Sequence, residues 1–331
     1  MDRIRMKAVI AREPGGPEVL QVVERPVPAL QPGEVLIRVV AAGVNRPDLM
    51  QRSGSAIPPG VTDVLGLEAA GIVVAVGSRV DECAVGDRVM ALLNGGGYAE
   101  YCVAQAAHCL PVPAGLSLHA ATAVPEAAFT VWHTLFELGR LRSGDSVLIH
   151  GAASGVGSFA VQCAQAAGAR VIATAGGPQK VAMLQALGVW RAIDRHLEDF
   201  VAVVHDCTQG RGVDVVLDNV GGPYVARNLA AMAMGGRHVS LSFLQGANIE
   251  LDLQVLMRKN LSLTSSTLRP KSHAEKARLA ACIRSRVLPW LAAGVVRPQI
   301  HAQLPLSQAA DAHRLLEANA NVGKVVLTVA E

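Results

Sequence analysis

The sequence predicts a two-domain α/β protein in which an antiparallel β-rich domain is joined to a doubly wound parallel sheet. Three observations lead to this fold class. The 331 residues exceed what one hydrophobic core usually supports. Residues 6–124 contain short β-like runs separated by glycine and proline turns. From residue 147 onward, short apolar runs alternate instead with stretches of helical periodicity.

The β-rich domain is predicted from runs of branched apolar residues. Residues 34–40 (EVLIRVV), 71–76 (GIVVAV) and 87–92 (DRVMAL) have strand composition. The glycines at 95–97 then turn the chain into a further run, YAEYCV, at 98–103. Strands and turns at this spacing predict an antiparallel, barrel-like domain.

The second domain is predicted from six short buried strands with helices between them. In the first helix, Val156, Ala160, Cys163 and Ala167 recur at helical spacing, and Gly168 ends it. The pattern predicts a parallel sheet covered on both faces. The strands are expected at 147–150, 170–174, 191–194, 213–217, 237–241 and 261–265.

After Leu268 the sequence predicts two more helices and a final strand. The helices are expected at about 273–293 and 307–318, and the strand, KVVLTV, at 324–329. The α/β domain is therefore predicted to be inserted late in the chain.

Composition excludes several classes of protein. With 51% hydrophobic residues and a formal net charge of +3, the chain is neither disordered nor strongly basic. We therefore expect no nucleic acid and no membrane as main partner. No apolar run reaches the roughly 18 residues of a membrane span, and the start lacks the apolar stretch of a signal peptide. We expect a cytoplasmic protein whose six scattered cysteines are reduced.

A glycine-rich turn joins the first predicted strand of the α/β domain to its helix. Residues 147–157 read VLIH-GAASGVG, and small residues there let a backbone approach phosphate groups at the helix N-terminus. The strand before and the helix after favour a dinucleotide site over a plain tight turn. The predicted contacts are Ala153, Ser154, Gly155, Val156 and Gly157.

The second predicted strand ends without an acid. Dinucleotide folds that prefer NAD place Asp or Glu about 20 residues past the glycines, whereas residues 173–180 read ATAGGPQK. Without that carboxylate a 2′-phosphate meets no repulsion, and Lys180 supplies a counter-charge. Lys180 as an ordinary solvated lysine is the alternative. We predict NADPH, with Arg195 as a further phosphate contact.

The motifs carry a family resemblance over nearly the whole chain. The chain resembles the medium-chain dehydrogenase/reductase superfamily, and within it the zinc-free, zeta-crystallin-type NADPH:quinone oxidoreductases. The resemblance implies a chaperonin-like (GroES-like) catalytic domain at 1–124 and 268–331, a Rossmann NADP-binding domain at 125–267, and a homodimer. The motifs that carry it are GPEVL at 16–20, PGEV at 32–35, AGVN at 42–45, GLEAAG at 66–71, GDRV at 86–89, AASGVG at 152–157, AG at 175–176, EDF at 198–200, STLR at 266–269 and NVGK at 321–324.

The same resemblance implies which residues form the site. It places Asn45 and Asp48 on the nicotinamide side as catalytic residues, whereas the residues alone favour Asn45 in a turn that satisfies its own backbone. The expected cofactor contacts, besides the glycine turn, are Thr130, Gly176, Lys180, Arg195, Asn219, Ser242, Phe243, Ser266, Thr267, Leu268 and Asn321.

The zinc ligands of metal-dependent relatives are missing. Those relatives carry a Cys where Asn45 stands and a His where Leu67 stands, which leaves Glu68 without these partners. Zinc needs three or four converging N, S or O ligands. We therefore expect a zinc-independent enzyme whose acceptor is already electrophilic, a quinone or an unsaturated carbonyl.

Alternatives remain at the acceptor. Residues 52–60 (RSGSAIPPG) lack the tyrosine that many relatives carry there, and Ala56 and Ile57 predict a smoother pocket. An enone or alkenal reductase and a non-catalytic NADPH-binding protein therefore stay open beside the quinone reductase. The remaining charged residues are predicted to be structural or solvated: His119, His133, His150, Lys271, Lys276, Arg278, Arg284 and Arg286.

Overall fold

The computed structural model describes residues 4–55, 57 and 60–329, and the chain forms two compact units. Unit 1 is assembled from three stretches of sequence, Met1–Phe129, Arg269–Ala292 and Pro298–Glu331. Unit 2 comprises Thr130–Leu268 and Ala293–Arg297. Unit 1 therefore depends on residues that lie on both sides of unit 2 in the sequence.

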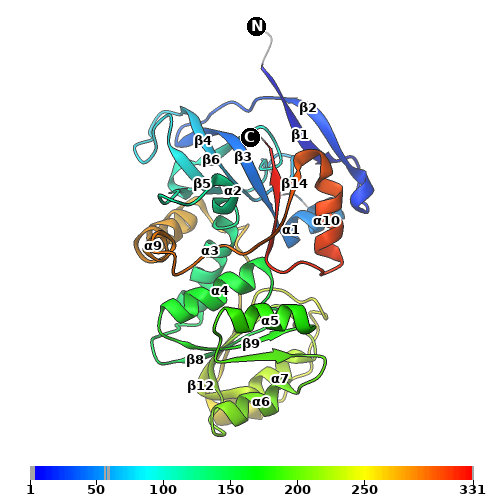
Figure 1. Ribbon diagram of the computed structural model, residues 1–331, viewed down its shortest axis with the longest axis vertical. Helices are drawn as coiled ribbons and strands as arrows, with labels where there is room; N and C mark the ends of the chain where they lie inside the picture. The colour runs from blue at the N-terminus through cyan, green and yellow to red at the C-terminus, as the bar shows by residue number, and fades with distance from the viewer. Residues whose placement is uncertain (1–3, 56, 58–59, 330–331) are drawn as a thin grey trace. The chain divides into compact units, whose positions relative to one another are not determined.

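Unit 1 is built on a seven-stranded sheet and a separate two-stranded ribbon (Figure 1). The order in the larger sheet is β14-β15-β3-β4-β5-β7, with β6 also paired to β3. All pairings are antiparallel except β14 with β15, which is parallel. The strands are β1 (Arg5–Ala11), β2 (Leu20–Pro26), β3 (Glu34–Val44), β4 (Glu68–Val76), β5 (Arg88–Leu92), β6 (Tyr101–Gln105), β7 (Cys109–Pro111), β14 (Ile300–Pro305) and β15 (Lys324–Thr328).

The helices of unit 1 begin at recognisable sequence features. Pro47 stands in the first turn of α1, where its missing N–H costs nothing, and the side chain of Ser117 caps α2. The helix α3 (Pro125–Val131) continues from unit 1 into unit 2. The others are α1 (Arg46–Arg52), α2 (Leu118–Ala121), α9 (His273–Ala292) and α10 (Ala309–Glu317), with short 3₁₀ turns η1 (Pro17–Val19), η2 (Ala106–His108) and η4 (Leu306–Gln308).

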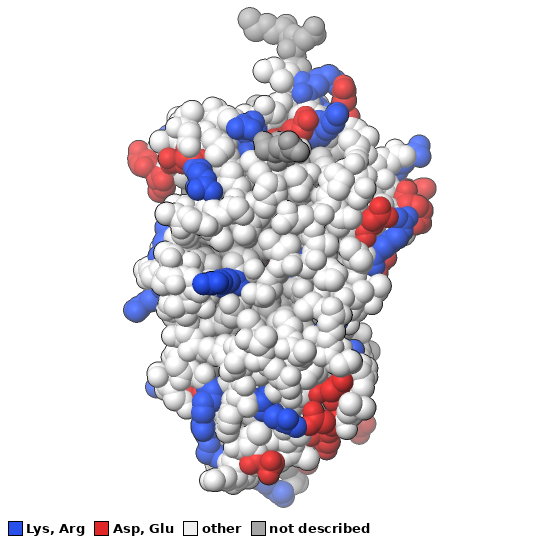
Figure 2. All heavy atoms as spheres, in the orientation of Figure 1, with Lys and Arg blue, Asp and Glu red and all other residues white. Residues whose placement is uncertain are grey.

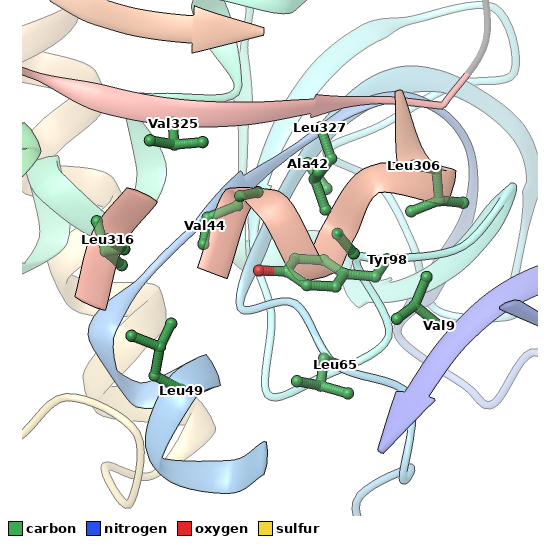
Figure 3. Close-up of a cluster of buried hydrophobic side chains, with 12 residues drawn as sticks. Val9, Ala42, Val44, Leu49, Leu65, Tyr98, Leu306, Leu316, Val325 and Leu327 are labelled. Carbon is green, nitrogen blue, oxygen red and sulfur yellow. The ribbon is translucent and has the colours of Figure 1, made fainter. Parts of the chain in front are cut away.

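One core cluster of unit 1 packs α10 against the sheet (Figure 3). Tyr98 is fully buried in its centre, between apolar residues of β3, α1, α10 and β15. Burying an aromatic side chain removes a large apolar area from water and stabilises the fold by about 1.5–3 kcal/mol. The cluster consists of Val9, Ala42, Val44, Leu49, Leu65, Tyr98, Leu306, Ala309, Ala312, Leu316, Val325 and Leu327.

Unit 2 contains a six-stranded, fully parallel sheet of order β10-β9-β8-β11-β12-β13. The predicted fold class is therefore confirmed, since all six strands form close to where the apolar runs place them. They are β8 (Ser146–Ile149), β9 (Arg170–Ala175), β10 (Arg191–Asp194), β11 (Val213–Asp218), β12 (Met232–Ser240) and β13 (Ser262–Ser265).

Helices cover both faces of this sheet. Figure 1 shows α4 and α5 on one side of the strands and α6 and α7 on the other. The predicted first helix is confirmed as α4, and Gly168 follows it with a positive φ of 83°. The helices are α4 (Gly155–Ala166), α5 (Pro178–Ala186), α6 (Phe200–Cys207), α7 (Tyr224–Ala231) and α8 (Leu253–Lys259), and a π-helical segment, η3 (Trp132–Leu138), follows α3.

Two expectations about polar residues come out differently. Lys276 was expected on a solvated helix face, but it is 1% exposed and donates to Asn94 Oδ1 at 2.6 Å. The prediction for Lys276 was wrong because a distant partner lets α9 bury the ammonium group. Arg284 is half-buried and donates to the carbonyl of Cys109, whereas Arg278 and Arg286 are exposed.

The surface carries both signs of charge. On the face shown in Figure 2, lysines and arginines are interspersed with aspartates and glutamates, and no large patch has a single sign. Within residues 4–55, 57 and 60–329, no helix combines the length and the apolar composition needed to cross a bilayer.

Candidate functional site

The predicted cofactor residues of unit 2 follow the carboxyl ends of its strands. Because the strands are all parallel, these ends meet at one edge of the sheet. The strand order reverses between β8 and β11, which is where open α/β sheets bind ligands. The topology therefore brings the predicted residues that follow β8 to β13 to a single edge.

The glycine turn between β8 and α4 is closely packed. Ser154 caps α4, and its Oγ accepts from the N–H of Gly157 at 3.0 Å. A Cβ at Gly157 would stand 2.5 Å from the carbonyl oxygen of Gly151, so only glycine fits. Ala153 is buried, while Ser154, Gly155 and Val156 are partly exposed. The first-turn N–H groups of Gly155 and Val156 have no partner within the helix, and they suit an anionic diphosphate.

Arg195 and His196 lie beside Gly176, where β9 ends. A Cβ at Gly176 would lie 3.0 Å from Arg195 Nε and 2.6 Å from His196 Nε2. Burial lowers the pKa of Lys180, and the positive charge of Arg195 lowers it further, which places the two cations near each other. An anion between them would relieve this repulsion. Sequence reasoning missed His196, which lies beyond any motif and is recognisable only from its contact with Gly176.

Asp194 lies next to these cations, and its carboxylate is directed to the backbone. Asp194 Oδ1 accepts from the N–H groups of His196 and Gly177, at 3.0 and 3.2 Å. These hydrogen bonds, His196 first, lower the pKa of Asp194. Asp194 thus holds the backbone next to Gly176 in place.

Asn219 carries an unsatisfied polar atom. Its Oδ1 is buried without a hydrogen-bond partner, and its side chain lies where a Cβ on Gly151 would stand, 2.4 Å from Nδ2. Buried acceptors are nearly always satisfied, so an orphaned one points to a missing donor. The carbonyl of Asn219 is held by Ser242 Oγ at 2.7 Å. The orphaned atom and the tight glycines fit a nicotinamide dinucleotide.

The other predicted contacts of unit 2 lie in loops and at helix ends. Phe243 is 47% exposed beside Gly221, and the N–H of Ser266 donates to the carbonyl of Ser240 at 3.3 Å. Thr267 is exposed and Leu268 is partly exposed, both just after β13. Thr130 lies in α3, where its carbonyl accepts from Thr134 Oγ1 at 2.6 Å.

In unit 1, Asn45 belongs to a buried ionic triad. Its Nδ2 donates to Glu68 Oε1 at 2.9 Å, and its Oδ1 accepts from Lys324 Nζ at 2.6 Å. Lys324 also pairs with Glu68 at 2.5 Å, and these two side chains are 4% and 0% exposed. Glu68, which lacks the partners found in zinc-dependent relatives, has instead a cation and an amide. These two contacts fix the orientation of the Asn45 amide and distinguish its nitrogen from its oxygen.

Asp48 positions the backbone of Asn45 and of Gly66 through hydrogen bonds. Its carboxylate accepts from the N–H groups of Asn45 at 2.8 Å and Gly66 at 3.2 Å, and from Tyr98 Oη at 3.3 Å. Burial raises the pKa of Asp48 to about 7. At 1% exposure, Asp48 holds the start of α1 and the loop before β4 in place.

Two further polar residues adjoin this triad. Glu126 contacts Glu68, and Asn321 shortly precedes Lys324 in the sequence. The N–H of Glu126 donates to Glu68 Oε2 at 2.8 Å, and burial raises the pKa of Glu126 to about 8, with the negative charge of Glu68 adding to it. Asn321 precedes β15, is 5% exposed and donates to the carbonyl of Gly323 at 2.6 Å. It thereby shapes the turn that leads to Lys324.

A chain of hydrogen bonds supports Asp48 from α10. Arg52 Nη1 faces His313 Nδ1 at 3.3 Å, and His313 Nε2 faces Tyr98 Oη at 3.3 Å. Because Arg52 can only donate, Nδ1 accepts, and the neutral ring carries its proton on Nε2. Tyr98 then donates to Asp48. Burial, followed by the charge of Arg52, lowers the pKa of His313 to about 3.

We expect this histidine to make the protein less stable in acid. Its folded-state pKa lies below the ordinary value of about 6.5, so the unfolded chain takes up the proton more readily. The contribution of His313 is present above pH 6.5 and is lost as pH falls toward 3. From pH 7 to pH 5, wild type should lose about 2 kcal/mol more of its unfolding free energy than His313→Gln. Urea unfolding of both proteins at the two pH values measures this, and an equal loss would contradict it.

No group of three or more His, Cys, Asp or Glu side chains is arranged to hold a metal ion among the residues that the structure describes. The acceptor-side stretch expected at 52–60 is only partly described, because Ala56, Pro58 and Pro59 lie outside the described residues. Arg52, at its start, is buried and is paired with Glu317.

Comparisons with known proteins agree with this architecture. The family model described as "Alcohol dehydrogenase GroES-like domain" matches residues 31–114, and the one described as "Zinc-binding dehydrogenase" matches residues 155–283. A quinone oxidoreductase of Pseudomonas aeruginosa is 34% identical over 316 residues, which cover 95% of this chain and 96% of that protein. The chain therefore belongs to the medium-chain dehydrogenase/reductase superfamily, a class of nicotinamide-dependent oxidoreductases.

Within that superfamily, quinone oxidoreductases match the chain over nearly its whole length. The crystal structure of Escherichia coli quinone oxidoreductase complexed with NADPH has a TM-score of 0.86 and 33% identity, and the match covers 98% of this chain and 100% of that one. The structure titled NAD-dependent alcohol dehydrogenase is also similar, with a TM-score of 0.88, 35% identity and the same coverage.

The chain also matches part of some much larger proteins. A mycocerosic acid synthase-like polyketide synthase of Mycobacterium tuberculosis is 34% identical over 300 residues. The match covers 90% of this chain but only 14% of that protein.

Proposed function

We propose that this chain reduces quinones with NADPH and without a metal ion. The observation that carries the choice of cofactor is that Lys180 lies near Arg195, and Arg195 beside Gly176, where β9 ends without an acid. A 2′-phosphate carries negative charge to that place, and two cations favour it, whereas an NAD-specific carboxylate would repel it. The similarity to quinone oxidoreductases supports the acceptor class.

Each candidate residue has a role in this proposal. The first-turn N–H groups of Gly155 and Val156 bind the pyrophosphate, with Ala153, Ser154 and Gly157 shaping the turn. Lys180 and Arg195 bind the 2′-phosphate. Asn219 accepts a hydrogen bond from the nicotinamide half, supported by Ser242. Thr130, Gly176, Phe243, Ser266, Thr267, Leu268 and Asn321 complete the proposed cofactor contacts.

Asn45 is proposed to orient the ribose or the carbonyl of the acceptor. NADPH supplies a hydride when it is bound. Lys324 and Glu68 each occupy one end of the Asn45 amide, and Nδ2 also lies 3.5 Å from the carbonyl oxygen of Gly43, so the remaining lone pair of Oδ1 points in a defined direction. Asp48 positions Asn45 through its backbone N–H. A pre-oriented polar group needs no reorganisation when the acceptor binds.

The proposed independence from zinc rests on the residues at positions 45 and 67. An amide and a leucine offer no ligand pair, and Glu68 is already neutralised by Lys324. The domain assignment of 1–124 and 268–331 as catalytic and 125–267 as NADP-binding, the homodimer and the cytoplasmic location stay predictions. The edge strand β13 is the proposed dimer contact.

Initial rates with a panel of quinones, enones and alkenals, each with NADPH and NADH, test the proposal. We expect quinone reduction that prefers NADPH by at least roughly tenfold, unchanged after treatment of the protein with a chelator. Loss of activity on chelation would overturn the metal-free mechanism. A preference for enones would favour double-bond reduction, the alternative that the sequence leaves open. NADPH binding without turnover of any acceptor would favour a non-catalytic role.

A further inference from the structure

Two cysteines of unit 1, far apart in sequence, lie side by side. Cys83 belongs to the exposed connection between β4 and β5, and Cys109 is the first residue of β7. Both pack in one apolar cluster with Val89, Ala91 and Cys102. Cys109 stands opposite Ala91 in the β5–β7 ladder, which fixes its backbone.

Their thiol groups are in contact. The side chains of Cys83 and Cys109 form a hydrogen bond with each other. Cys83 Sγ also lies 4.0 Å from the carbonyl oxygen of Ala106, and Cys109 Sγ 3.6 Å from that of Gln105. The two sulfur atoms are thus directed at the carbonyls of adjacent residues in one turn.

The two thiols differ in access and in acidity. Cys83 is half-buried, whereas Cys109 is 1% exposed. The hydrogen bond from Cys109 lowers the pKa of Cys83, with the Arg284 guanidinium helping and Asp87 and Glu82 opposing. The same pairing, with burial, raises the pKa of Cys109 well above its usual value. Cys83 is therefore the thiol that ionises and meets an oxidant first.

We propose that Cys83 and Cys109 form a reversible intramolecular disulfide on exposure to hydrogen peroxide. The Cys83 thiolate attacks the peroxide, which breaks the O–O bond and gives a Cys83 sulfenic acid and hydroxide. The Cys109 sulfur then attacks the Cys83 sulfur, forms the S–S bond and releases water, its thiol proton going with the leaving hydroxyl. The two thiols lose two electrons in total, and one peroxide is reduced to two waters.

Of the other four cysteines in the described part of the chain, three have a raised pKa, and Cys282 is half-buried in α9. Cys102 is buried beside Cys109, and burial raises its pKa to about 12, so it does not react first. Cys163 is buried in α4 of unit 2, with its pKa raised by burial. Burial also raises the pKa of Cys207, which is half-buried in α6.

Thiol mapping of the full-length protein tests the proposal. Reduced protein is treated with hydrogen peroxide, blocked with N-ethylmaleimide, digested and analysed by mass spectrometry. We expect a peptide pair linked through Cys83 and Cys109, loss of two of the six free thiols, and recovery of both on addition of dithiothreitol. A link to Cys102, a link between two chains, or six thiols that remain free would overturn it.

Variants separate the two roles. Cys83→Ser should keep the other five thiols free under the same treatment, and Cys109→Ser should leave a Cys83 sulfenic acid that dimedone traps. Cys109→Ala serves if the serine variant does not fold. Cys207→Ser is the matched control, and it should form the Cys83–Cys109 link as wild type does. Formation of the disulfide in wild type without any dimedone adduct in both Cys109 variants would contradict the order of the steps.

Discussion

Replacing Lys180 with alanine is expected to weaken NADPH binding about 10- to 100-fold and to leave NADH binding nearly unchanged. A hydrogen bond to a charged group contributes about 1.5–3 kcal/mol, and each 1.4 kcal/mol corresponds to a factor of ten in affinity. The positive charge of Arg195 lowers the pKa of Lys180, so the two side chains lie near each other and Arg195→Ala should act in the same direction. The double variant should lose most of its preference for NADPH.

The measurement is a titration of each variant with NADPH and with NADH, followed by fluorescence or calorimetry. Arg258→Ala is the matched control, because Arg258 is an exposed arginine of the same unit whose guanidinium donates to Gln254. It should leave both affinities as they are. If Lys180→Ala weakens both cofactors equally, the 2′-phosphate is not bound there.

Replacing Lys324 with methionine is expected to cost about 3–5 kcal/mol of the unfolding free energy of unit 1. Methionine fills a similar volume but leaves the Glu68 carboxylate buried, at 0% exposure, without its cation. Removing one partner of a buried ion pair costs much more than the pair itself contributes. The Asn45 amide would also lose the donor that fixes its Oδ1.

A double-mutant cycle and a surface control make this result specific. Glu68→Gln combined with Lys324→Met removes both charges and should destabilise the protein less than Lys324→Met alone. Lys7→Met, which removes an exposed lysine, should change stability by no more than about 0.5 kcal/mol. Urea unfolding followed by circular dichroism measures five proteins: wild type, Glu68→Gln, Lys324→Met, the double variant and Lys7→Met. If Lys324→Met changes stability as little as Lys7→Met does, Lys324 does not stabilise the buried Glu68 carboxylate.

Much of unit 2 could be predicted from the sequence because its information is local. The apolar runs of its six strands, the periodicity before Gly168 and the glycine turn at 151–157 all lie within short windows. Two details escaped. β12 begins at Met232, before the pair Gly235 and Gly236 that favours a turn, because Met232 pairs with Val213 of β11. The π-helical segment Trp132–Leu138 has no sequence pattern of its own.

Unit 1 was less predictable because its site is made by distant contacts. Glu68 and Lys324 meet through the pairing of β3 with β4 and β15, and no pattern near either residue indicates the other. The strand β14 was missed because it lies between Pro298 and Pro305 and is stabilised by its parallel partner β15. Tyr98, His313 and Arg52 likewise form one hydrogen-bonded chain that only the fold reveals.

The division of unit 1 into three stretches of sequence has a consequence for the growing polypeptide. Ribosomes make Glu68 early, but Lys324 only after every residue of unit 2. Until Lys324 leaves the ribosome, the Glu68 carboxylate has no cation and must stay hydrated or take up a proton. Unit 2, with nearly all of its residues in one stretch, is free to fold first. Unit 1 therefore cannot form its Glu68–Lys324 ion pair until unit 2 has been synthesised. Until then, the nascent β-rich unit stays accessible to chaperones.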